Sequence, residues 1–414
     1  MPASVRVGPA RRALLALAFG SFGLATGEFV MLGLLPNVAV SVHVSIPTAG
    51  YLISAYALGV VIGAPLLTAV SVRLPRKGLL VGLVLALAVG NFGSGLVRGY
   101  VPLLIFRFLS GLPHGAYFGV ATVVASGLVD ARRRSQAMGI VFAGLTVANI
   151  VGVPVTTFVG QHAGWRVVFG AIGALEVLAA LAITVVVPKP HRDEGAEAPA
   201  LAHELRAFRQ SQVWLTLAVG VVGGGAMFAS FSYIAPMMTH AAGYAESSVT
   251  LLLVLFGVGM TAGNFVGARL ADHNLMYALY SALASESVIA ALFFFTDRNK
   301  VTAAIWIALL PFTAMAIIPA IQSRLITLAG EAPNLAAASM HSAFNVANSI
   351  GAWLGGLTIA AGYGYSSPNL VAAGLAVLGL GIALYAGSRQ RAPAAIGREL
   401  RIIGPPERSR SKAG

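Results

Sequence analysis

Five ionisable residues lie inside long apolar stretches of this 414-residue sequence: Glu28, Arg107, His114, Glu176 and Glu286. An ionisable side chain inside a hydrocarbon layer is energetically expensive, so such residues face a protein interior or a water-filled cavity and mark functional sites. A carboxyl group can bind and release a proton, a histidine transfers protons near neutral pH, and an arginine stabilises an ionised carboxylate. The five residues therefore indicate proton transfer, buried ion pairing, or both, provided that the stretches around them cross a membrane.

The composition indicates that they do. Hydrophobic residues make up 57% of the chain, charged residues 10%, and the mean hydropathy is +0.83. A soluble domain has about 25% charged residues, because water must wet its surface. The apolar runs are far longer than the ~10 residues of a barrel strand and suit helices of roughly 20 residues that cross the hydrocarbon core. The sequence predicts an all-α membrane protein with most of its surface in lipid.

Charged and turn-forming residues divide the chain into twelve predicted membrane spans. A polar segment separates six spans from six, which predicts an N-terminal half (1–187), a cytoplasmic linker (188–212), a C-terminal half (213–387) and a basic tail (388–414). The basic N-terminus has no cleavage site of A-x-A type, so we expect the first span to be retained. The predicted spans are 13–35, 48–70, 78–97, 102–127, 136–158, 166–187, 213–236, 248–270, 275–296, 301–324, 335–360 and 366–387.

The distribution of Lys and Arg predicts the orientation of the spans, because basic residues collect in cytoplasmic loops. With a cytoplasmic N-terminus, 22 of the 27 Lys and Arg residues lie on the cytoplasmic side and four on the other, the last being Arg107. We therefore expect both termini in the cytoplasm and the protein in the plasma or inner membrane. This bias and the basic tail explain the net charge of +13 without a nucleic-acid partner. We expect the tail to touch anionic lipid headgroups.

Several kinds of chemistry have no residues to support them. The chain has no cysteine, which excludes disulfides, thiol chemistry and cysteine-bound metals. The metalloprotease, serine-hydrolase, Walker and dinucleotide-binding motifs are all missing from the sequence, and His203-Glu204 has no second histidine beside it. We therefore predict that the protein is not an enzyme, binds no metal or cofactor and is not driven by ATP.

The two predicted halves resemble each other in sequence. TVANIVG (146–152) and NVANSIG (345–351) share Val-Ala-Asn followed two residues later by Gly. These two segments are 199 residues apart, and an offset of 200 superposes three other pairs without a gap: Pro36 on Pro236, Gly59 on Gly259 and Gly63 on Gly263. Parallel halves of six spans, with a binding site between them near the middle of the membrane, occur in secondary transporters.

Polar residues surround the repeated asparagines at mid-depth. Asn149 lies in the first half, and Asn345 and Asn348 lie in the second half with His341 nearer a span end. Neighbouring glycines would let helices approach closely. Two interpretations remain open: the amides bind a polar substrate in a cavity, or they hold the halves together where these move. Aromatic residues that could line the apolar part of a cavity are Tyr117, Phe118, Phe231 and Tyr233.

Two segments resemble the major facilitator superfamily and, within it, the drug/proton antiporters. RFLSGLPHGA (107–116) is similar to the fourth-span motif, an Arg followed by a glycine-rich run. GLTVANIVGVP (144–154) is similar to the fifth-span antiporter motif and contains Gly144, Gly152 and Pro154, although it ends in Gly-Val-Pro instead of Gly-Pro.

A third segment, SVRLPRK (71–77), matches the family's loop between spans two and three only in part. Arg73, Arg76 and Lys77 are present, but Val72 occupies the usual acidic position and a proline replaces the usual glycine. The counterpart in the second half, ARLADH, keeps the acid as Asp272. The usual charge interaction of this loop is therefore in doubt in the first half.

A narrower resemblance covers nearly the whole chain. TGEFVMLGLLP, SGLPHGAYFGVA and AFNVANSIGAWLGG are similar to the arabinose efflux permease branch, which also contains actinobacterial chloramphenicol exporters. The resemblance implies twelve helices in two pseudo-symmetric halves and proton-coupled export of a small amphipathic compound by alternating access. Export of a sugar or metabolite, and uniport without proton coupling, are the alternatives. We expect a small-molecule substrate, protons and membrane lipid as partners, and a monomer.

The family topology places spans one and four together around a central cavity, where the depths of Glu28 and Arg107 overlap. We expect Glu28 to carry the coupled proton, Arg107 to tune Glu28 or bond backbone carbonyls of the neighbouring helix, and His114 to relay protons or meet substrate. A static ion pair and a packing histidine are the alternatives. Glu176 and Glu286 lie on spans that are peripheral in the superfamily, where we expect protonated, hydrogen-bonded carboxyls.

Overall fold

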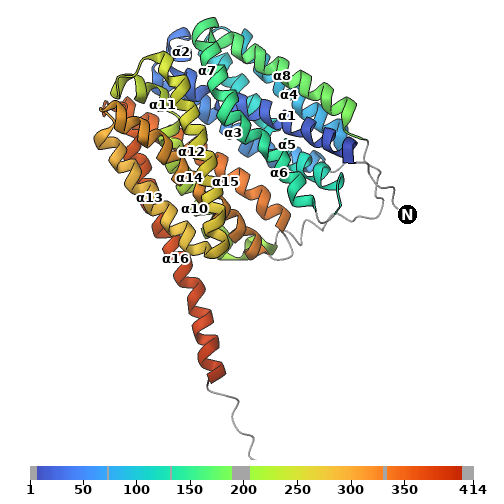
Figure 1. Ribbon diagram of the computed structural model, residues 1–414, viewed down its shortest axis with the longest axis vertical. Helices are drawn as coiled ribbons and strands as arrows, with labels where there is room; N and C mark the ends of the chain where they lie inside the picture. The colour runs from blue at the N-terminus through green and yellow to red at the C-terminus, as the bar shows by residue number, and fades with distance from the viewer. Residues whose placement is uncertain (1–6, 72–73, 131–132, 189–205, 330–332, 403–414) are drawn as a thin grey trace, which may run out of the picture.

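Long helices form two bundles that lie side by side in the computed structural model (Figure 1). The structure describes residues 7–71, 74–130, 133–188, 206–329 and 333–402, and these residues contain no β-strand. The first bundle comprises α1 (Val7–Phe29), α2 (Met31–Ser41), α3 (Ile46–Ser71), α4 (Arg76–Leu96), α5 (Tyr100–Gly127), α6 (Arg134–Val147), the π-helical η2 (Ala148–Gly152), α7 (Val153–Ala163) and α8 (Trp165–Val186).

The second bundle follows the short helix η3 (Arg206–Arg209). It comprises α10 (Ser211–Phe231), α11 (Ile234–Pro236), the π-helical η4 (Met237–Ala241), α12 (Glu246–His273), α13 (Leu275–Thr296), α14 (Lys300–Ala329), α15 (Pro333–Ala360) and α16 (Pro368–Ile402).

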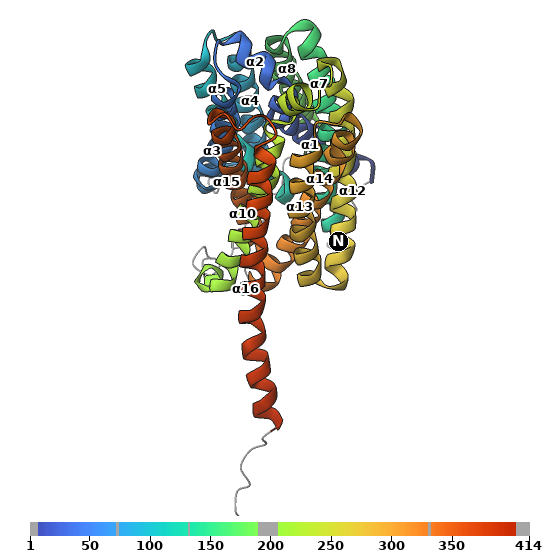
Figure 2. The ribbon, with the colours of Figure 1, turned by 90° about the vertical axis from the view of Figure 1, so that its left-hand side faces the viewer.

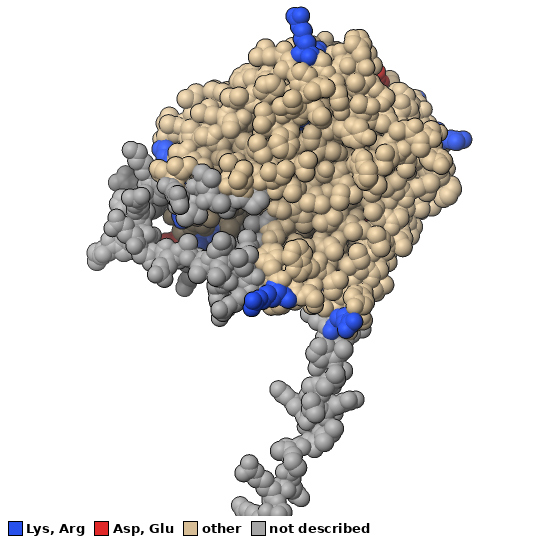
Figure 3. Space-filling model, turned by 180° about the vertical axis from the view of Figure 1, so that it is seen from behind, with Lys and Arg blue, Asp and Glu red and all other residues tan. Residues whose placement is uncertain are grey.

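Most of these helices can cross a membrane. Ten described helices are long and apolar enough, and the bent pair α1 and α2 forms an eleventh candidate. Large apolar side chains point outward from the bundles; Val185 is 81% exposed and Phe295 72% exposed. Figure 3 shows one face with few charged residues, most of them near its edges. The twelfth long helix, α15, which carries His341, Asn345 and Asn348, is not among these candidates. An all-helical membrane fold is thereby confirmed.

The predicted spans agree with the helices to within a few residues at most ends, with two informative differences. The first predicted span, 13–35, is divided by a bend of 47° between α1 and α2 and continues to Ser41. The last, 366–387, belongs to a helix that continues to Ile402, so the predicted tail begins inside α16. The predicted linker lies mostly outside the described residues.

The offset of 200 in the sequence recurs in the packing of the helices. A Cβ atom added to any of four glycines would collide with a carbonyl oxygen on the neighbouring helix, so only glycine allows these helices to come so close. The four contacts are Gly59 with Phe108, Gly63 with Leu112, Gly259 with Ala308 and Gly263 with Phe312. The α3–α5 contact of the first half therefore repeats, residue for residue, as the α12–α14 contact of the second.

The two bundles are joined by contacts at one end and at mid-depth. The helix α2 packs on α11, and α7 packs on α12, where Gln161 Nε2 donates to the Glu246 carbonyl at 2.8 Å. At mid-depth α3 and α15 lie side by side (Figure 2), and Ser54 and Ser349 each donate a hydroxyl to the other's carbonyl at 3.1 and 3.4 Å. In Figure 1 the bundles meet near α2 and α11 and diverge away from them.

Candidate functional site

The bend in the first span creates a site for a cation. The helix α1 ends at Phe29 and α2 begins at Met31, so the last carbonyls of α1 lose part of their helical partners. Arg107 of α5 donates to two of these carbonyls, from Nη1 to Gly27 at 2.9 Å and from Nη2 to Glu28 at 3.4 Å. A positive charge at a helix C-terminus also interacts favourably with the helix dipole. The guanidinium thus caps the broken helix.

Arg107 is fully buried and packs against aromatic rings as well as carbonyls. Its guanidinium carbon lies 4.4 Å from the ring centre of Tyr56 on α3 and 5.7 Å from that of Phe169 on α8. A cation over an aromatic face is attracted to the electrons of the ring. Arg107 therefore ties α1, α3 and α8 to α5 without a direct hydrogen bond to the Glu28 carboxylate among the described contacts.

The carboxyl group of Glu28 lies where the two bundles meet. Its Oε2 is 3.9 Å from Nδ1 of His114 on α5, and its Oε1 accepts a 3.5 Å hydrogen bond from Asn348 Nδ2 on α15. The same His114 nitrogen is 3.0 Å from the Tyr56 hydroxyl. Glu28 is only 6% exposed. The structure thus brings together four residues predicted from the sequence: Glu28, Arg107, His114 and Asn348.

A group of aromatic rings lies beside His114 and bridges the two halves. Phe118, Phe142 and His341 are nearly parallel, with ring centres 5.2 to 5.6 Å apart, and Phe118 is 5.5 Å from His114. Phe118 and Phe142 come from the first half and His341 from the second. An aromatic wall therefore stands next to His114, the neighbour of the Glu28 carboxyl, and it includes two of the predicted cavity residues, Phe118 and His341.

The antiporter-like segment packs against α1, the helix that carries Glu28. A Cβ added to Gly144 would fall on the Ala18 carbonyl oxygen, and one added to Gly152 would fall on the Thr26 hydroxyl. Pro154 is buried two residues further along the chain, in α7. The π-helical turn η2 interrupts this span at the Val-Ala-Asn repeat, and such turns are frequent at functional sites.

The two repeated asparagines occupy different environments. Asn149 donates its side-chain amide to Leu145 of its own helix, and its backbone packs against Gly257 of α12 in the other half. Asn345 likewise donates to the His341 carbonyl of its own helix. Asn149 therefore touches the other half through its backbone, whereas Asn348 reaches the Glu28 carboxyl with its side chain.

The remaining predicted cavity residues are buried: Tyr117 and Phe231 lie in the core clusters, whereas Tyr233 lies where the halves meet, since a Cβ added to Gly50 of α3 would fall on its hydroxyl oxygen. Tyr117 donates its hydroxyl to the Leu17 carbonyl at 2.6 Å, and Tyr233 donates to the Ala352 carbonyl at 2.8 Å. Phe231 lies in the apolar core of the second half. These three side chains join helices in this arrangement and are not among the contacts of Glu28.

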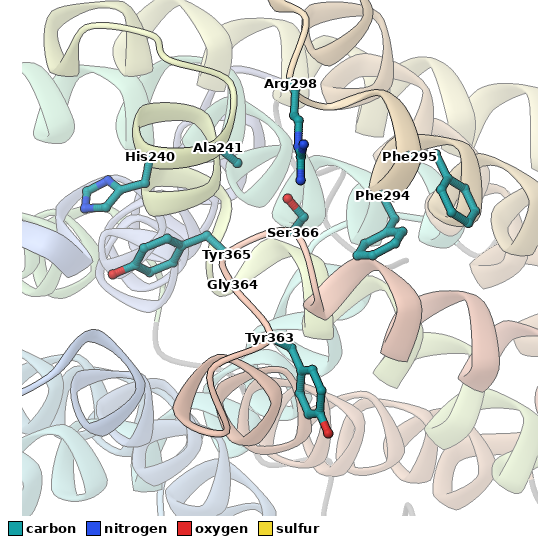
Figure 4. Close-up of a pocket in the computed structure, with 9 residues that line it drawn as sticks. All are labelled: His240, Ala241, Phe294, Phe295, Arg298, Tyr363, Gly364, Tyr365 and Ser366. Carbon is teal, nitrogen blue, oxygen red and sulfur yellow. The ribbon is translucent and has the colours of Figure 1, made fainter.

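The predicted loop residues lie away from this site. Arg76 and Asp272 are exposed, Lys77 is half-buried, and Arg73 lies outside the described residues. A hollow of about 650 Å³ opens at the end of the second half that carries η4 and the connection between α15 and α16. The residues that line it include His240, Arg298 and Tyr365 (Figure 4). None of the predicted site residues lines that hollow.

Comparison of the halves shows that the ionisable and phenolic residues around Glu28 in the first half have no polar counterparts in the second half. At the offset of 200, Glu28 and each of these residues corresponds to an apolar residue of one core cluster in the second half. The correspondences are Glu28 with Phe228, Tyr56 with Phe256, Arg107 with Ile307 and His114 with Ala314. The second half contributes Asn348 and His341 from α15 instead.

The sequence analysis did not single out two participants, Tyr56 and Asn91. Tyr56 lies under Arg107 and bonds His114, whereas Asn91 of α4 donates to both oxygens of Glu176. Neutral polar residues are common in membrane helices, so neither stood out. The correspondence of Tyr56 with an apolar Phe256 is the signal that could have identified it.

An all-helical bundle of two related halves, with buried ionisable groups where the halves meet, defines a membrane transporter. The chain belongs to the major facilitator superfamily, whose profile matches residues 17–340. It is 41% identical over 369 residues to the inner membrane transport protein YdhP of Escherichia coli O157:H7, covering 88% of this chain and 94% of that one.

Two further relatives match most of the chain. The putative transporter AraJ of Escherichia coli K12 is 33% identical over 386 residues, covering 93% of this chain and 97% of its own. The chloramphenicol resistance protein of Streptomyces lividans is 33% identical over 365 residues, covering 86% and 90%. The branch indicated by the sequence motifs is thereby confirmed, and the chain is a multi-pass inner-membrane transporter and not an enzyme.

Solved structures support the same fold. A bacterial homologue of the human lysosomal transporter Spinster, in an inward-facing and unoccupied conformation, superposes with a TM-score of 0.71 at 15% identity, covering 92% of this chain and 96% of that chain. At this identity the likeness concerns the fold, in which twelve helices form two halves.

Proposed function

We propose that this transporter exports a small amphipathic compound in exchange for protons, and that the Glu28 carboxyl carries the proton. Both termini would then lie in the cytoplasm, as the excess of Lys and Arg on that side predicts. The proposal is supported above all by one observation: the buried Glu28 carboxyl contacts groups from both halves, His114 and Asn348.

Alternating access requires the two halves to move relative to each other around a site at mid-depth. Such a movement separates Asn348 of α15 from Glu28 of α1 and thereby changes what surrounds the carboxyl. A carboxyl group binds a proton more or less readily as its hydrogen bonds, neighbouring charges and exposure to water change. The position of the halves and the protonation of Glu28 are coupled in this way.

Arg107 keeps its contacts during this exchange, because its partners are backbone carbonyls and not the carboxylate. Its hydrogen bonds to Gly27 and Glu28 hold the guanidinium beside Glu28 whether or not Glu28 is protonated. His114, which bonds the Tyr56 hydroxyl, lies next to the carboxyl and can take up the proton of Glu28 on its ring nitrogen. Arg107 and His114 thus act on Glu28 in different ways.

The surroundings of Glu28 favour an amphipathic substrate. Phe118, Phe142 and His341 offer flat apolar surfaces, and Asn348 and Glu28 offer hydrogen bonds within the same region. Sites for small molecules combine apolar walls with a few polar groups in this manner. The relative in Streptomyces lividans is named for chloramphenicol resistance, and chloramphenicol, an aromatic and polar molecule, is the first candidate.

Everted membrane vesicles with an acid interior test the proposal. Chloramphenicol, other antibiotics and pentoses are added in turn while a pH-sensitive dye reports proton release. We expect at least one compound to release protons from vesicles with the wild-type protein, and Glu28→Gln to abolish the release. Glu286→Gln, which changes another buried carboxyl, should retain it. Transport of a compound by wild type and Glu28→Gln at equal rates without proton movement contradicts the proposal.

A further inference from the structure

The proposed mechanism does not use Glu176. This residue is held in a defined position near the part of α1 that carries Glu28. The carboxyl is fully buried on α8, and Asn91 Nδ2 of α4 donates to Oε1 at 3.0 Å and to Oε2 at 2.9 Å. Both oxygens accept a hydrogen bond, which suits an ionised carboxylate.

This pair packs directly on the backbone of α1, within two turns of Glu28. A Cβ added to Gly23 would lie 3.2 Å from Cγ of Glu176, and one added to Gly27 would lie 3.2 Å from Nδ2 of Asn91. Gly27 is also the residue whose carbonyl accepts the Arg107 guanidinium at 2.9 Å. One turn of α1 therefore contacts Asn91, Glu176 and Arg107.

Arg107 reaches the surroundings of both carboxyls through α1. Its guanidinium donates to the backbone carbonyls of Gly27 and Glu28, and Gly27 packs on Asn91, which holds the Glu176 carboxyl. The other titratable groups that face the cluster are Tyr56 of α3 and His114 of α5, with His341 of α15 acting on His114.

The charges of the cluster do not balance without a proton. One guanidinium and two ionised carboxylates carry a net charge of minus one, and a net charge buried in a membrane protein is costly. One bound proton makes the cluster neutral. Two buried atoms also lack a hydrogen-bond partner among the described residues, the donor Nε of Arg107 and the acceptor Oδ1 of Asn91, so the pattern can rearrange.

We propose that Glu28 and Glu176 form a single proton-binding unit around Arg107, in which Glu176, fixed by Asn91, is the standing counter-ion and Glu28 takes up and releases the proton. The inference rests on the proposed function for the transport role of Glu28, but not for the pairing of the charges. Glu176 is then a positioning residue that acts on Glu28 through Arg107.

The first test measures the pairing without transport. Thermal unfolding of the full-length protein in detergent is compared for Glu28→Gln, Glu176→Gln and the double variant. Each single variant leaves Arg107 one counter-ion, whereas the double variant leaves none. We expect the double variant to melt at least about 3 °C below the value that the sum of the single effects predicts.

Two controls make this result specific. The pair Glu28→Gln with Glu286→Gln should be additive, because the fully buried Glu286 lies on α13 of the second half, whereas Arg107 lies on α5 of the first half. In an Arg107→Met background, the melting temperature of the Glu28→Gln and Glu176→Gln double variant should equal the value that the sum of the single effects predicts. Additivity of Glu28→Gln and Glu176→Gln in the presence of Arg107 overturns the proposal.

The second test is a readout that a purely structural role would not change. In everted vesicles, Glu176→Gln should move the acid limb of substrate-driven proton release to lower pH by at least about one unit, because Arg107 then stabilises the negative charge of Glu28 alone. Glu176→Asp should return the acid limb of this pH dependence to its wild-type position, and Glu286→Gln should leave it there.

If the pH dependence of proton release by Glu176→Gln coincides with that of wild type and of Glu286→Gln, the proposal is overturned. If wild type releases no protons with any compound while the stability cycle is non-additive, the antiport function fails and the charge pairing stands.

Discussion

The side-chain amide of Asn348 donates a hydrogen bond of 3.5 Å to the carboxyl of Glu28, across 320 positions of sequence. Glu28 lies on the last turn of α1 before the bend, and Asn348 lies in the middle of α15. The contact therefore joins a titratable group of one half to a neutral group of the other. Its existence depends on how the halves are placed.

The chain lacks cysteine, so pairs of introduced thiols can test whether the halves move. Ser54 and Ser349 exchange hydrogen bonds at 3.1 and 3.4 Å between α3 and α15. We expect Ser54→Cys with Ser349→Cys to cross-link on oxidation and to lose transport about tenfold or more, because alternating access needs this contact to open. A reductant should restore transport.

The matched control places the thiols within one half. Ser367 and Thr358, whose hydroxyls are 2.9 Å apart, both belong to the second half, so cross-linking Ser367→Cys to Thr358→Cys should leave transport unchanged. Wild-type rates in the fully cross-linked Ser54–Ser349 pair would show that the halves do not separate there.

The repeated glycine contacts predict symmetric losses of stability. Alanine at Gly59 or at Gly259 would push its Cβ into a carbonyl oxygen, of Phe108 in one half and Ala308 in the other. Overpacking of this kind costs about 1–3 kcal/mol. We expect Gly59→Ala and Gly259→Ala to lower the melting temperature in detergent by similar amounts.

Gly82 provides the control, because nothing lies within 4 Å of a Cβ added there. Gly82→Ala in the middle of α4 should leave the melting temperature unchanged or raise it, since alanine favours a helix over glycine. A loss at Gly82 equal to that at Gly59 would mean that general helix effects, and not the contact with Phe108, set the stability.

The sequence predicted the helices better than the bend. Charged loops and long apolar runs mark the spans, so the ends were predicted to within a few residues. The break between Phe29 and Met31 was not predicted, because neither proline nor glycine occupies position 30 and proline follows only at position 36. The break is stabilised from outside, by Arg107 of α5 on the Gly27 and Glu28 carbonyls.

Site residues were predicted where a charge is unusual in its segment. Glu28, Arg107 and His114 stand out among apolar neighbours, and the structure brings them together. Tyr56 and Asn91 were missed, because a single phenol or amide in a membrane helix is ordinary. The contact of Glu28 with Asn348 could not be predicted either, since it requires the relative position of two halves that local sequence does not encode.

Asp297, at the end of α13 outside the membrane-spanning helix, predicts a pH effect on stability. Burial raises the pKa of Asp297 above its usual value, against the opposing influence of Ser366 and Arg298. A raised pKa in the folded protein means that folding favours the protonated form, so this group makes the protein more stable as the pH falls through the raised pKa toward the usual value of about 3.9.

We expect Asp297→Asn to melt at a higher temperature than wild type at pH 7.5 and to show a smaller change between pH 7.5 and pH 5. Asp272→Asn, at an exposed position, should follow wild type at both values. A lower melting temperature of Asp297→Asn at pH 7.5 would mean that the ionised carboxylate stabilises the fold.

Purified protein in liposomes gives the most direct test of Glu28 as the proton carrier. Radiolabelled chloramphenicol, or whichever compound releases protons in vesicles, is followed in two modes: accumulation driven by an imposed pH gradient, and exchange of labelled for unlabelled compound without a gradient. We predict that wild type performs both and that Glu28→Gln retains exchange but loses gradient-driven accumulation. Accumulation by Glu28→Gln at the wild-type level would contradict the assignment of the proton to Glu28.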